Sequence, residues 1–262
     1  MKQARDLHRT SLPKLDNYFQ RIEYNNCVAL ASPEFRSKVP DTETLLSVLS
    51  TGEQVESGGR GGARFVSISD CDWIVRDYRR GGLQGKINRD RYLFWNEETV
   101  RALHEARLLN YLFALGLPVP RVVAALYQRF AMTYRCTIIL ERLNGVQPFG
   151  DVAFNLPECR WFRVGQLIRR LHNCRVNHVD LNCFNILVSE SEDYLIDFDK
   201  CYLVHNNLVN CFCDWKKCNL NRLRRSLYKL VKGKDVSCFE SLWRQLQAGY
   251  QMGEGNCSGT IG

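Results

Sequence analysis

Two carboxylates and an amide lie close together in the chain, within "HVDLNCFNIL" (178–187) and "IDFDK" (196–200). They are Asp180, Asn185 and Asp197, and each has apolar neighbours. Carboxylates are rarely buried without a partner, and Mg²⁺ prefers hard oxygen ligands. We therefore expect a metal ion and a phosphate chain to neutralise these groups, as in phosphoryl transfer from ATP. The alternative is that the two acids are structural residues near turns.

The spacing of the three residues matches the parts that phosphoryl transfer needs. Asp180 and Asn185 have the D-x-x-x-x-N spacing of the protein-kinase catalytic loop, and Asp197 takes the place of the Asp in the kinase D-F-G triplet. Asp180 would orient the attacking hydroxyl and accept its proton, while Asn185 and Asp197 would hold Mg²⁺ against the phosphates. His178 is expected to pack under the loop. Because "YLIDFD" is expected to pair with "NILV", both acids should project into one cleft.

The same chemistry needs a loop that covers the phosphates and a cation that a helix glutamate steadies. In "GGRGGARF", Gly59 and Gly61 would let backbone amides approach the phosphates; otherwise this segment is a plain hairpin turn. Arg76, in "WIVR", stands where protein kinases have a strand lysine and can bind phosphate, with Lys86 as the alternative. Glu105 is the candidate glutamate, or else it is simply solvated, since it lies off the apolar stripe of its helix.

The elements that must position these residues change from strands to helices along the chain. Segments 57–68 and 72–82 predict an antiparallel hairpin, and 135–145 predicts a strand followed by a turn. Apolar spacing predicts amphipathic helices within 96–115 and 156–174. The expected apolar faces are Val100, Leu103, Leu108, Tyr111, Leu112 and Leu115 in the first helix, and Val164, Leu167, Ile168 and Leu171 in the second.

This order predicts an α+β, protein-kinase-like bilobal fold with a β-rich N-lobe and a shortened helical C-lobe. We expect residues 1–50 to be an N-terminal segment of unknown role, 51–143 to be the N-lobe, and 144–262 to be the C-lobe with the catalytic loop. Glu141 lies beside the expected hinge, where it would hold adenine by backbone hydrogen bonds.

Composition and charge exclude several other classes of protein. The 262 residues contain no low-complexity tract, no secretory signal and no apolar stretch long enough to cross a bilayer, so a cytoplasmic protein is expected. The twelve cysteines are expected to be reduced, and Cys211, Cys213 and Cys218 lack the spacing of a zinc site. A net charge of +8 attracts anions, but no nucleic-acid motif is present and no such partner is expected. Nothing in the sequence indicates the oligomeric state.

Five segments together carry a family resemblance: "GGRGGARFV", "VRDYRRGGLQGKINRDRYLF", "LGLPVPRVVAA", "HVDLNCFNIL" and "YLIDFDKC". Over about Gly58 to Lys200, the chain resembles the 3-deoxy-D-manno-octulosonic acid (Kdo) kinases, which are close to the lipopolysaccharide core heptose kinases in the protein-kinase-like superfamily. The resemblance implies a phosphotransferase that uses ATP and Mg²⁺ to phosphorylate the 4-hydroxyl of Kdo on Kdo-lipid A. It also implies a peripheral protein at the cytoplasmic face of the bacterial inner membrane, with Asp180 as the catalytic residue.

The chain departs from the eukaryotic kinase pattern in having DFD for DFG, Arg76 on the strand and no A-P-E segment. The missing A-P-E segment removes the usual peptide-docking platform, which favours a small or lipid-linked hydroxyl as the acceptor. A basic run that includes Arg79 and Arg80 is expected to bind the anionic acceptor, or else to form a solvated face. Segment 220–234 predicts a basic amphipathic helix that lies on anionic lipid or packs on the C-lobe.

Two other functions are compatible with these residues. A related kinase would act on core heptose or on an aminoglycoside-like small molecule, although a basic acceptor site is unsuited to a cationic drug. A pseudokinase would bind nucleotide or a partner without turnover. Arg76 in place of lysine keeps the pseudokinase open, whereas the presence of Asp180, Asn185 and Asp197 argues against it.

Overall fold

The computed structural model describes residue 12 and residues 18–54, 63–79, 90–204, 214–231 and 236–252. The chain forms two compact units. One comprises residues 12–113 and 120–144, and the other comprises residues 114–119 and 145–262. We call the first the sheet unit and the second the helical unit. Together they give a mixed α+β structure with an antiparallel sheet in the first half and helices in the second.

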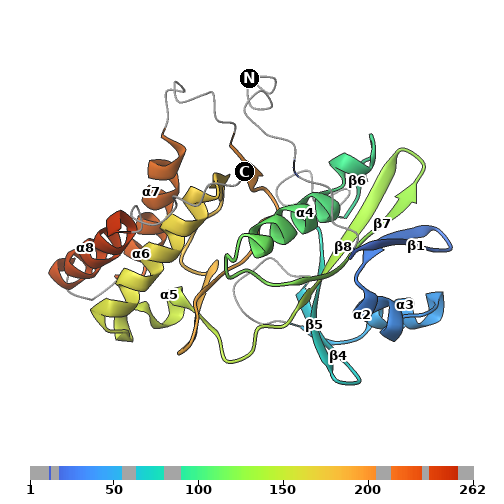
Figure 1. Cartoon of the computed structure of the whole chain (residues 1–262), viewed down its shortest axis with the longest axis horizontal. Helices are drawn as coiled ribbons and strands as arrows, with labels where there is room; N and C mark the ends of the chain where they lie inside the picture. Colours follow the sequence, from blue (N-terminus) through green and yellow to red (C-terminus); the bar gives the residue numbers. More distant parts are fainter. Residues whose placement is uncertain are drawn as a thin grey trace, which may run out of the picture. The chain divides into compact units, whose positions relative to one another are not determined.

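The sheet unit is built on an eight-stranded antiparallel sheet (Figure 1). Its strands are β1 (Gln20–Tyr24), β2 (Cys27–Ala31), β3 (Glu53–Gln54), β4 (Ala63–Ile68), β5 (Cys71–Asp77), β6 (Tyr92–Leu93), β7 (Val122–Phe130) and β8 (Thr133–Glu141). They lie in the order β1-β2-β7-β8-β5-β4-β3, and β6 pairs with β8. The predicted hairpin is β4–β5, with Phe65 opposite Ile74. Residues 20–50, to which the sequence assigned no role, contribute β1, β2 and two helices to this unit.

The helices of the sheet unit start at capping residues. α2 (Pro33–Lys38) follows Ser32, and α3 (Thr42–Ser50) follows Asp41; each cap accepts a hydrogen bond from a backbone N–H in the first turn. Asn96 and Thr99 form a capping box around the 3₁₀ turn η2 (Glu97–Thr99), which leads into α4 (Arg101–Ala114). Such caps satisfy N–H groups that the first turn of a helix leaves unpaired.

The predicted apolar face of α4 is largely confirmed. The residues of that face that are buried are Val100, Leu103, Leu108 and Leu112. Leu115 is 47% exposed, so its assignment to the buried face was wrong. The reason is that α4 ends at Ala114, and Gly116 then turns the chain with a φ of +72°, a conformation that glycine adopts readily.

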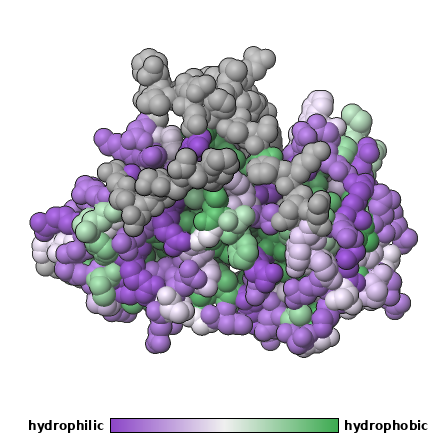
Figure 2. Space-filling model, in the orientation of Figure 1, coloured by the Kyte–Doolittle hydropathy of each residue, from purple (hydrophilic) through white to green (hydrophobic). Residues whose placement is uncertain are grey.

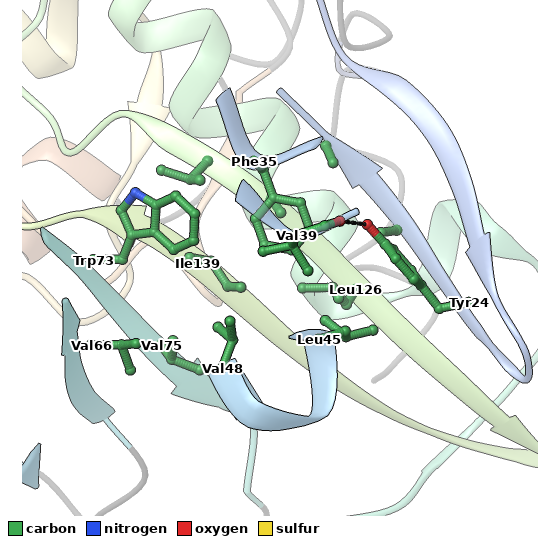
Figure 3. Packing of buried hydrophobic residues seen from close by; sticks show 14 residues of the cluster. Tyr24, Phe35, Val39, Leu45, Val48, Val66, Trp73, Val75, Leu126 and Ile139 are labelled. Atoms are coloured by element: carbon green, nitrogen blue, oxygen red, sulfur yellow. Dashed lines mark hydrogen bonds between the residues drawn. The ribbon is translucent and has the colours of Figure 1, made fainter. Parts of the chain in front are cut away.

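The main core of the sheet unit lies between the sheet and the helices α2 and α3 (Figure 3). Phe35, Leu45 and Val48 from the helices pack with strand residues that include Trp73 and Val75. Side chains alternate between the two faces of a strand. Because Val75 faces this core, its neighbour Arg76 faces the opposite side of the sheet, where α4 lies.

The helical unit combines helices with small antiparallel sheets. Its helices are α5 (Phe149–Val152), the 3₁₀ turn η3 (Ala153–Asn155), α6 (Glu158–Asn173), α7 (Trp215–Tyr228) and α8 (Val236–Met252). β11 (Ile186–Val188) pairs with β9 (Gln147–Pro148) and β12 (Tyr194–Leu195), and β10 (Val176–Asn177) pairs with β13 (Tyr202–Leu203). The face predicted for α6 is buried at all four positions, Val164, Leu167, Ile168 and Leu171.

α6 and α8 lie side by side and touch at two glycines (Figure 1). A Cβ atom on Gly165 of α6 would lie 2.0 Å from the carbonyl oxygen of Leu246, and one on Gly249 of α8 would lie 2.0 Å from that of Phe162. Atoms cannot approach so closely, so each helix needs a glycine where its backbone meets the other.

α7 overlaps the N-terminal part of segment 220–234, for which a basic amphipathic helix is predicted. Leu223 and Leu227 are fully buried within the protein. The apolar face of α7 is therefore packed in the helical unit and is not available to lipid, which corrects the membrane interpretation of this helix.

On the face shown in Figure 2, hydrophilic residues predominate among the described residues. Among the described residues, no helix has the length and apolar character needed to cross a membrane.

Candidate active site

The predicted catalytic loop is a tightly fixed loop between β10 and β11. The side-chain amides of Asn182 and Asn185 both donate to the carbonyl oxygen of Asp180, at 3.0 and 2.9 Å. Leu181 and Cys183 are fully buried and anchor the loop in the helical unit. The Asp180 side chain, by contrast, is 58% exposed. A rigid backbone thus presents the carboxylate to solvent.

A cation from α7 lies beside this carboxylate. The Nη1 atom of Arg222 is 3.7 Å from Oδ1 of Asp180, and both side chains are substantially exposed. An exposed ion pair contributes little to stability, so the importance of Arg222 is its position next to Asp180. The sequence placed Arg222 only in a basic helix, because no local pattern links it to a loop so far away in the chain.

The β11–β12 hairpin holds Asn185 and Asp197 at the same end. Ile186 is opposite Leu195, and the N–H of Ile196 donates to the carbonyl of Asn185 at 3.1 Å. Asp197 follows with a φ of +64°, a left-handed conformation that residues other than glycine adopt rarely, although Asp tolerates it better than most. Backbone strain of this kind is concentrated at functional sites.

The side-chain oxygen atoms at this end of the hairpin are suitable ligands for Mg²⁺. Asn185 uses its Nδ2 for the carbonyl of Asp180, and its Oδ1 accepts no hydrogen bond within the part of the chain that the structure describes. One amide oxygen and one carboxylate suit Mg²⁺, which keeps several waters and binds substrate phosphates rather than filling an all-protein cage. Asn185 and Asp197 are therefore the residues that would hold the ion.

His178 lies beneath the loop and is fully buried. Its backbone N–H donates to Oδ1 of Asn219 at 3.2 Å, and its Nε2 is 3.0 Å from the carbonyl oxygen of Ile196. Burial lowers the pKa of the His178 imidazole, so the ring is neutral and Nε2–H donates to that carbonyl. His178 thus packs under the loop and ties it to the residue that precedes Asp197.

Asn219 of α7 is the centre of a polar network that the sequence did not indicate. Its Oδ1 also lies 3.2 Å from Nε2 of His172, and its Nδ2 donates to Oδ1 of Asn177 at 2.9 Å. The Nδ1 of His172 is 2.7 Å from the hydroxyl of Tyr250, and burial lowers the pKa of His172 to about 4. The network joins α6, α7 and α8 to the catalytic loop through His178.

The sheet unit contains the predicted pair of a strand cation and a helix glutamate. Arg76 on β5 forms an ion pair with Glu105 on α4, and the hydroxyl of Tyr78 donates to the same carboxylate. Glu105 is fully buried, so the alternative of a solvated glutamate is wrong. It lies off the leucine stripe because it faces Arg76, whose side chain keeps 23% exposure. The carboxylate holds the guanidinium in a fixed position.

Glu141 ends β8 and is exposed. Its backbone N–H donates to the carbonyl of Arg121 at 3.0 Å, and its carboxylate lies 3.8 Å from the Arg121 guanidinium. The N–H of Glu141 is therefore already used within the sheet unit.

Of the remaining predicted residues, the structure describes two and leaves the others outside the described ranges. Arg79 follows β5 and is exposed, and Cys218 is an exposed cysteine on α7. The predicted residues that lie outside the described ranges are Gly59, Gly61, Arg80, Lys86, Cys211 and Cys213. The strands β3 and β4, which flank the glycine-rich segment, are antiparallel partners.

Comparison with known proteins identifies relatives over most of the chain. The family model described as "Lipopolysaccharide kinase (Kdo/WaaP) family" matches residues 49–250. A 3-deoxy-D-manno-octulosonic acid kinase of Mannheimia succiniciproducens is 40% identical over 74% of this chain and 82% of its own length. Proteins of the same name from Xylella fastidiosa and Haemophilus influenzae are each 38% identical, over 76% and 73% of this chain and 78% and 82% of their own length.

Among solved structures, WaaP in complex with acyl carrier protein matches 88% of this chain and 99% of that chain, with a TM-score of 0.48 and 14% identity. The residues matched by the family model include the catalytic loop, the β11–β12 hairpin and the Arg76–Glu105 pair. The chain belongs to the lipopolysaccharide kinase (Kdo/WaaP) family.

Proposed function

We propose that the protein transfers the γ-phosphate of ATP to the 4-hydroxyl of Kdo on Kdo-lipid A during assembly of the lipopolysaccharide inner core. Curated Kdo kinases align with about three quarters of the chain. The observation that carries the proposal is the fixed loop that presents the Asp180 side chain. The side-chain amide of Asn185 donates to the carbonyl of Asp180, and Asp197 lies at the end of the adjoining hairpin.

Asp180 would orient the attacking hydroxyl and accept its proton. The exposed side chain is accessible to an acceptor, and the fixed backbone limits the positions that the carboxylate can take. Arg222, beside it, is suited to an acidic sugar, because a guanidinium binds a carboxylate through charge-assisted hydrogen bonds. Kdo carries such a carboxylate next to the ring that must be positioned.

Asn185 and Asp197 would hold Mg²⁺. The ion, when bound, neutralises charge on the phosphates. The hydrogen bond from Asn185 to the Asp180 carbonyl couples the position of this metal ligand to the residue that orients the hydroxyl. The two functions of the loop therefore depend on one backbone carbonyl.

Arg76 would contact the phosphates of ATP, steadied by Glu105, while the backbone amides near Gly59 and Gly61 would cover them. Lys86 is the alternative cation. Support for Arg76 comes from its ion pair with the buried Glu105 and from the exposure that its side chain keeps. We assign the adenine contact to the backbone of Glu141.

The order of these parts also supports a protein-kinase-like bilobal fold. In the sheet unit, a glycine-rich segment joins two paired strands, β5 supplies the cation, and α4 supplies its glutamate. The helical unit supplies a catalytic loop followed by a hairpin and an Asp.

Arg79 and Arg80 are proposed to bind anionic groups of the acceptor. Kdo-lipid A carries carboxylates and phosphates, and it resides in a membrane. We therefore infer a peripheral protein that works at the cytoplasmic face of the inner membrane.

The test is transfer of labelled γ-phosphate from ATP with Mg²⁺ to purified Kdo-lipid A, with a heptose-bearing core acceptor in parallel. We expect Kdo-lipid A alone to be labelled, and NMR of the product to place the phosphate on the 4-hydroxyl. Labelling of only the heptose acceptor would reassign the substrate. Bound ATP without transfer to either acceptor would favour a pseudokinase.

A further inference from the structure

An exposed apolar cluster lies at the turn end of the β7–β8 hairpin and is used by no part of the proposed active site. It consists of Leu93, Trp95 and Met132, which are 57%, 78% and 75% exposed. We call these three residues the apolar tip. Single exposed apolar residues are common, but an exposed group that contains a tryptophan indicates an interaction surface.

Backbone pairing brings the three residues together. Leu93 on β6 is opposite Thr133 on β8, and the N–H of Phe94 donates to the carbonyl of Met132 at 2.9 Å. Figure 1 shows β6 beside the β7–β8 hairpin. Leu93 and Trp95 flank Phe94 in the chain, so the hydrogen bond from Phe94 to Met132 brings both of them close to the turn. Met132 occupies the turn next to them.

The residues on either side of Trp95 in the chain are both fixed by contacts. Phe94 stacks on Tyr127 with ring centroids 5.9 Å apart, and Asn96 forms the capping box of η2. Trp95 lies between these two fixed residues. Its side chain is therefore presented to solvent by an ordered backbone, which is what a preformed contact surface requires.

Arginines surround the apolar tip. The guanidinium of Arg91 lies 4.5 Å from the ring centroid of Phe130, and that of Arg129 lies 4.2 Å from that of Phe94. Arg135 stands over Phe130 as well and pairs with Asp90 at 2.7 Å. The other nearby acids are Glu97, which pairs with Arg21, and the exposed Glu98. Neither Arg91 nor Arg129 forms an ion pair with any residue in the described ranges.

We propose that the apolar tip inserts into the headgroup region of an anionic bilayer while Arg91 and Arg129 contact lipid phosphates. Tryptophan prefers the membrane interface, and basic residues beside an apolar anchor strengthen binding to anionic lipid. A projecting turn with a few apolar side chains suits a lipid surface better than a protein partner, which needs a larger complementary patch. The inference that the protein binds a membrane rests on the proposed function. The assignment of membrane binding to the apolar tip rests on the exposure of the tip and on the burial of Leu223 and Leu227 in α7.

The first test is co-sedimentation of the full chain with vesicles of phosphatidylcholine, with and without phosphatidylglycerol. We expect binding only with phosphatidylglycerol, and we expect the triple variant Leu93→Ser, Trp95→Ser, Met132→Ser to weaken it by roughly tenfold or more. Arg91→Gln with Arg129→Gln should weaken binding and reduce its dependence on salt. The matched control is Leu46→Ser, which removes a similarly exposed leucine from α3 and should bind as the wild type does.

The second test measures transfer to a deacylated, water-soluble Kdo acceptor. The triple variant should retain wild-type transfer to this acceptor and lose transfer to Kdo-lipid A in vesicles, which also shows that the variant is folded. Unchanged vesicle binding by the triple variant, or binding of the wild type to a soluble acidic protein but not to vesicles, would overturn the proposal. Tip-dependent vesicle binding without transfer to any acceptor would support the tip and reject the proposed function.

Discussion

At the scale of single residues, the Glu105 carboxylate accepts hydrogen bonds from two side chains, the guanidinium of Arg76 and the hydroxyl of Tyr78. A buried ion pair adds little net stability, but removal of one partner leaves the other charge poorly compensated. The benefit of the pair is that a guanidinium proposed to contact phosphate is held in one orientation.

We expect Glu105→Ala to lower the free energy of unfolding by about 2–4 kcal/mol and to raise the KM for ATP, because Arg76 loses the group that positions it. Urea denaturation and ATP titration measure the two effects. Glu98→Ala removes an exposed acid just before α4 and should change neither quantity. A Glu105→Ala protein with wild-type stability and a wild-type KM for ATP would show that the pair has no such role.

His172 makes the stability of the helical unit depend on pH. Burial lowers its pKa from 6.5 to about 4, so between these values the unfolded chain binds a proton that the folded chain does not. Its contribution to stability is therefore fully present above about pH 6.5 and is lost as the pH falls towards 4, by at most about 3 kcal/mol. Burial lowers the pKa of His178 as well, so His178 also contributes to the loss of stability at low pH.

We expect His172→Gln to have a smaller loss of unfolding free energy between pH 6.5 and about pH 5 than the wild type, because the titrating group is gone. Urea denaturation at several pH values measures the slope. Parallel profiles for the two proteins would mean that His172 is not protonated on unfolding in this range.

At the scale of elements, α6 and α8 depend on glycine where their backbones meet. Helix propensity alone favours alanine over glycine by about 1 kcal/mol. We nevertheless expect Gly165→Ala to destabilise the protein by about 1–3 kcal/mol, because the new Cβ atom would meet the carbonyl of Leu246. Thermal or urea unfolding measures the change. Gln247→Ala, at an exposed position of α8, is the control; a Gly165→Ala protein that is more stable than the wild type would contradict the close contact.

Elements with strong apolar periodicity could be predicted from the sequence. The buried faces of α4 and α6 follow from leucine and valine spacing, and Asn96 caps the 3₁₀ turn η2 that leads into α4. The strand predicted over 194–199 is confined to Tyr194–Leu195. Alternation of apolar and acidic residues resembles a strand, but it carries no information on the left-handed φ at Asp197, which ends the extended conformation.

The site residues that could be predicted are close together in the chain, whereas the ones that were missed come from a distant helix. One loop and the adjoining hairpin contain Asp180, Asn185 and Asp197, so the local spacing of these residues in the sequence predicts that they lie together. Arg222 and Asn219 reach the loop from α7, and only tertiary packing brings them there. A basic helix gives no local sign of which of its polar residues faces inward.

At the scale of the whole molecule, a net charge of +8 is suited to an anionic acceptor at an anionic surface. We expect Arg79→Gln with Arg80→Gln to raise the KM for Kdo-lipid A by roughly tenfold or more, because charge-assisted hydrogen bonds to the acceptor are lost. The KM for ATP should stay within about twofold. Arg224→Gln with Arg225→Gln removes the same charge from exposed positions of α7 and should leave both KM values unchanged. Equal increases in the two KM values after the Arg79 and Arg80 substitutions would argue against acceptor recognition there.

The most direct test of the central claim is single-turnover phosphate transfer to Kdo-lipid A by Asp180→Ala, together with its affinity for ATP. We expect transfer to fall by about 10²–10⁴-fold while the Kd for ATP is nearly unchanged, since the side chain of Asp180 orients the hydroxyl and not the nucleotide. Glu190→Ala removes an exposed acid from the nearby turn and should transfer phosphate as the wild type does. Wild-type transfer by Asp180→Ala would contradict the assignment of Asp180 and, with it, the proposed mechanism.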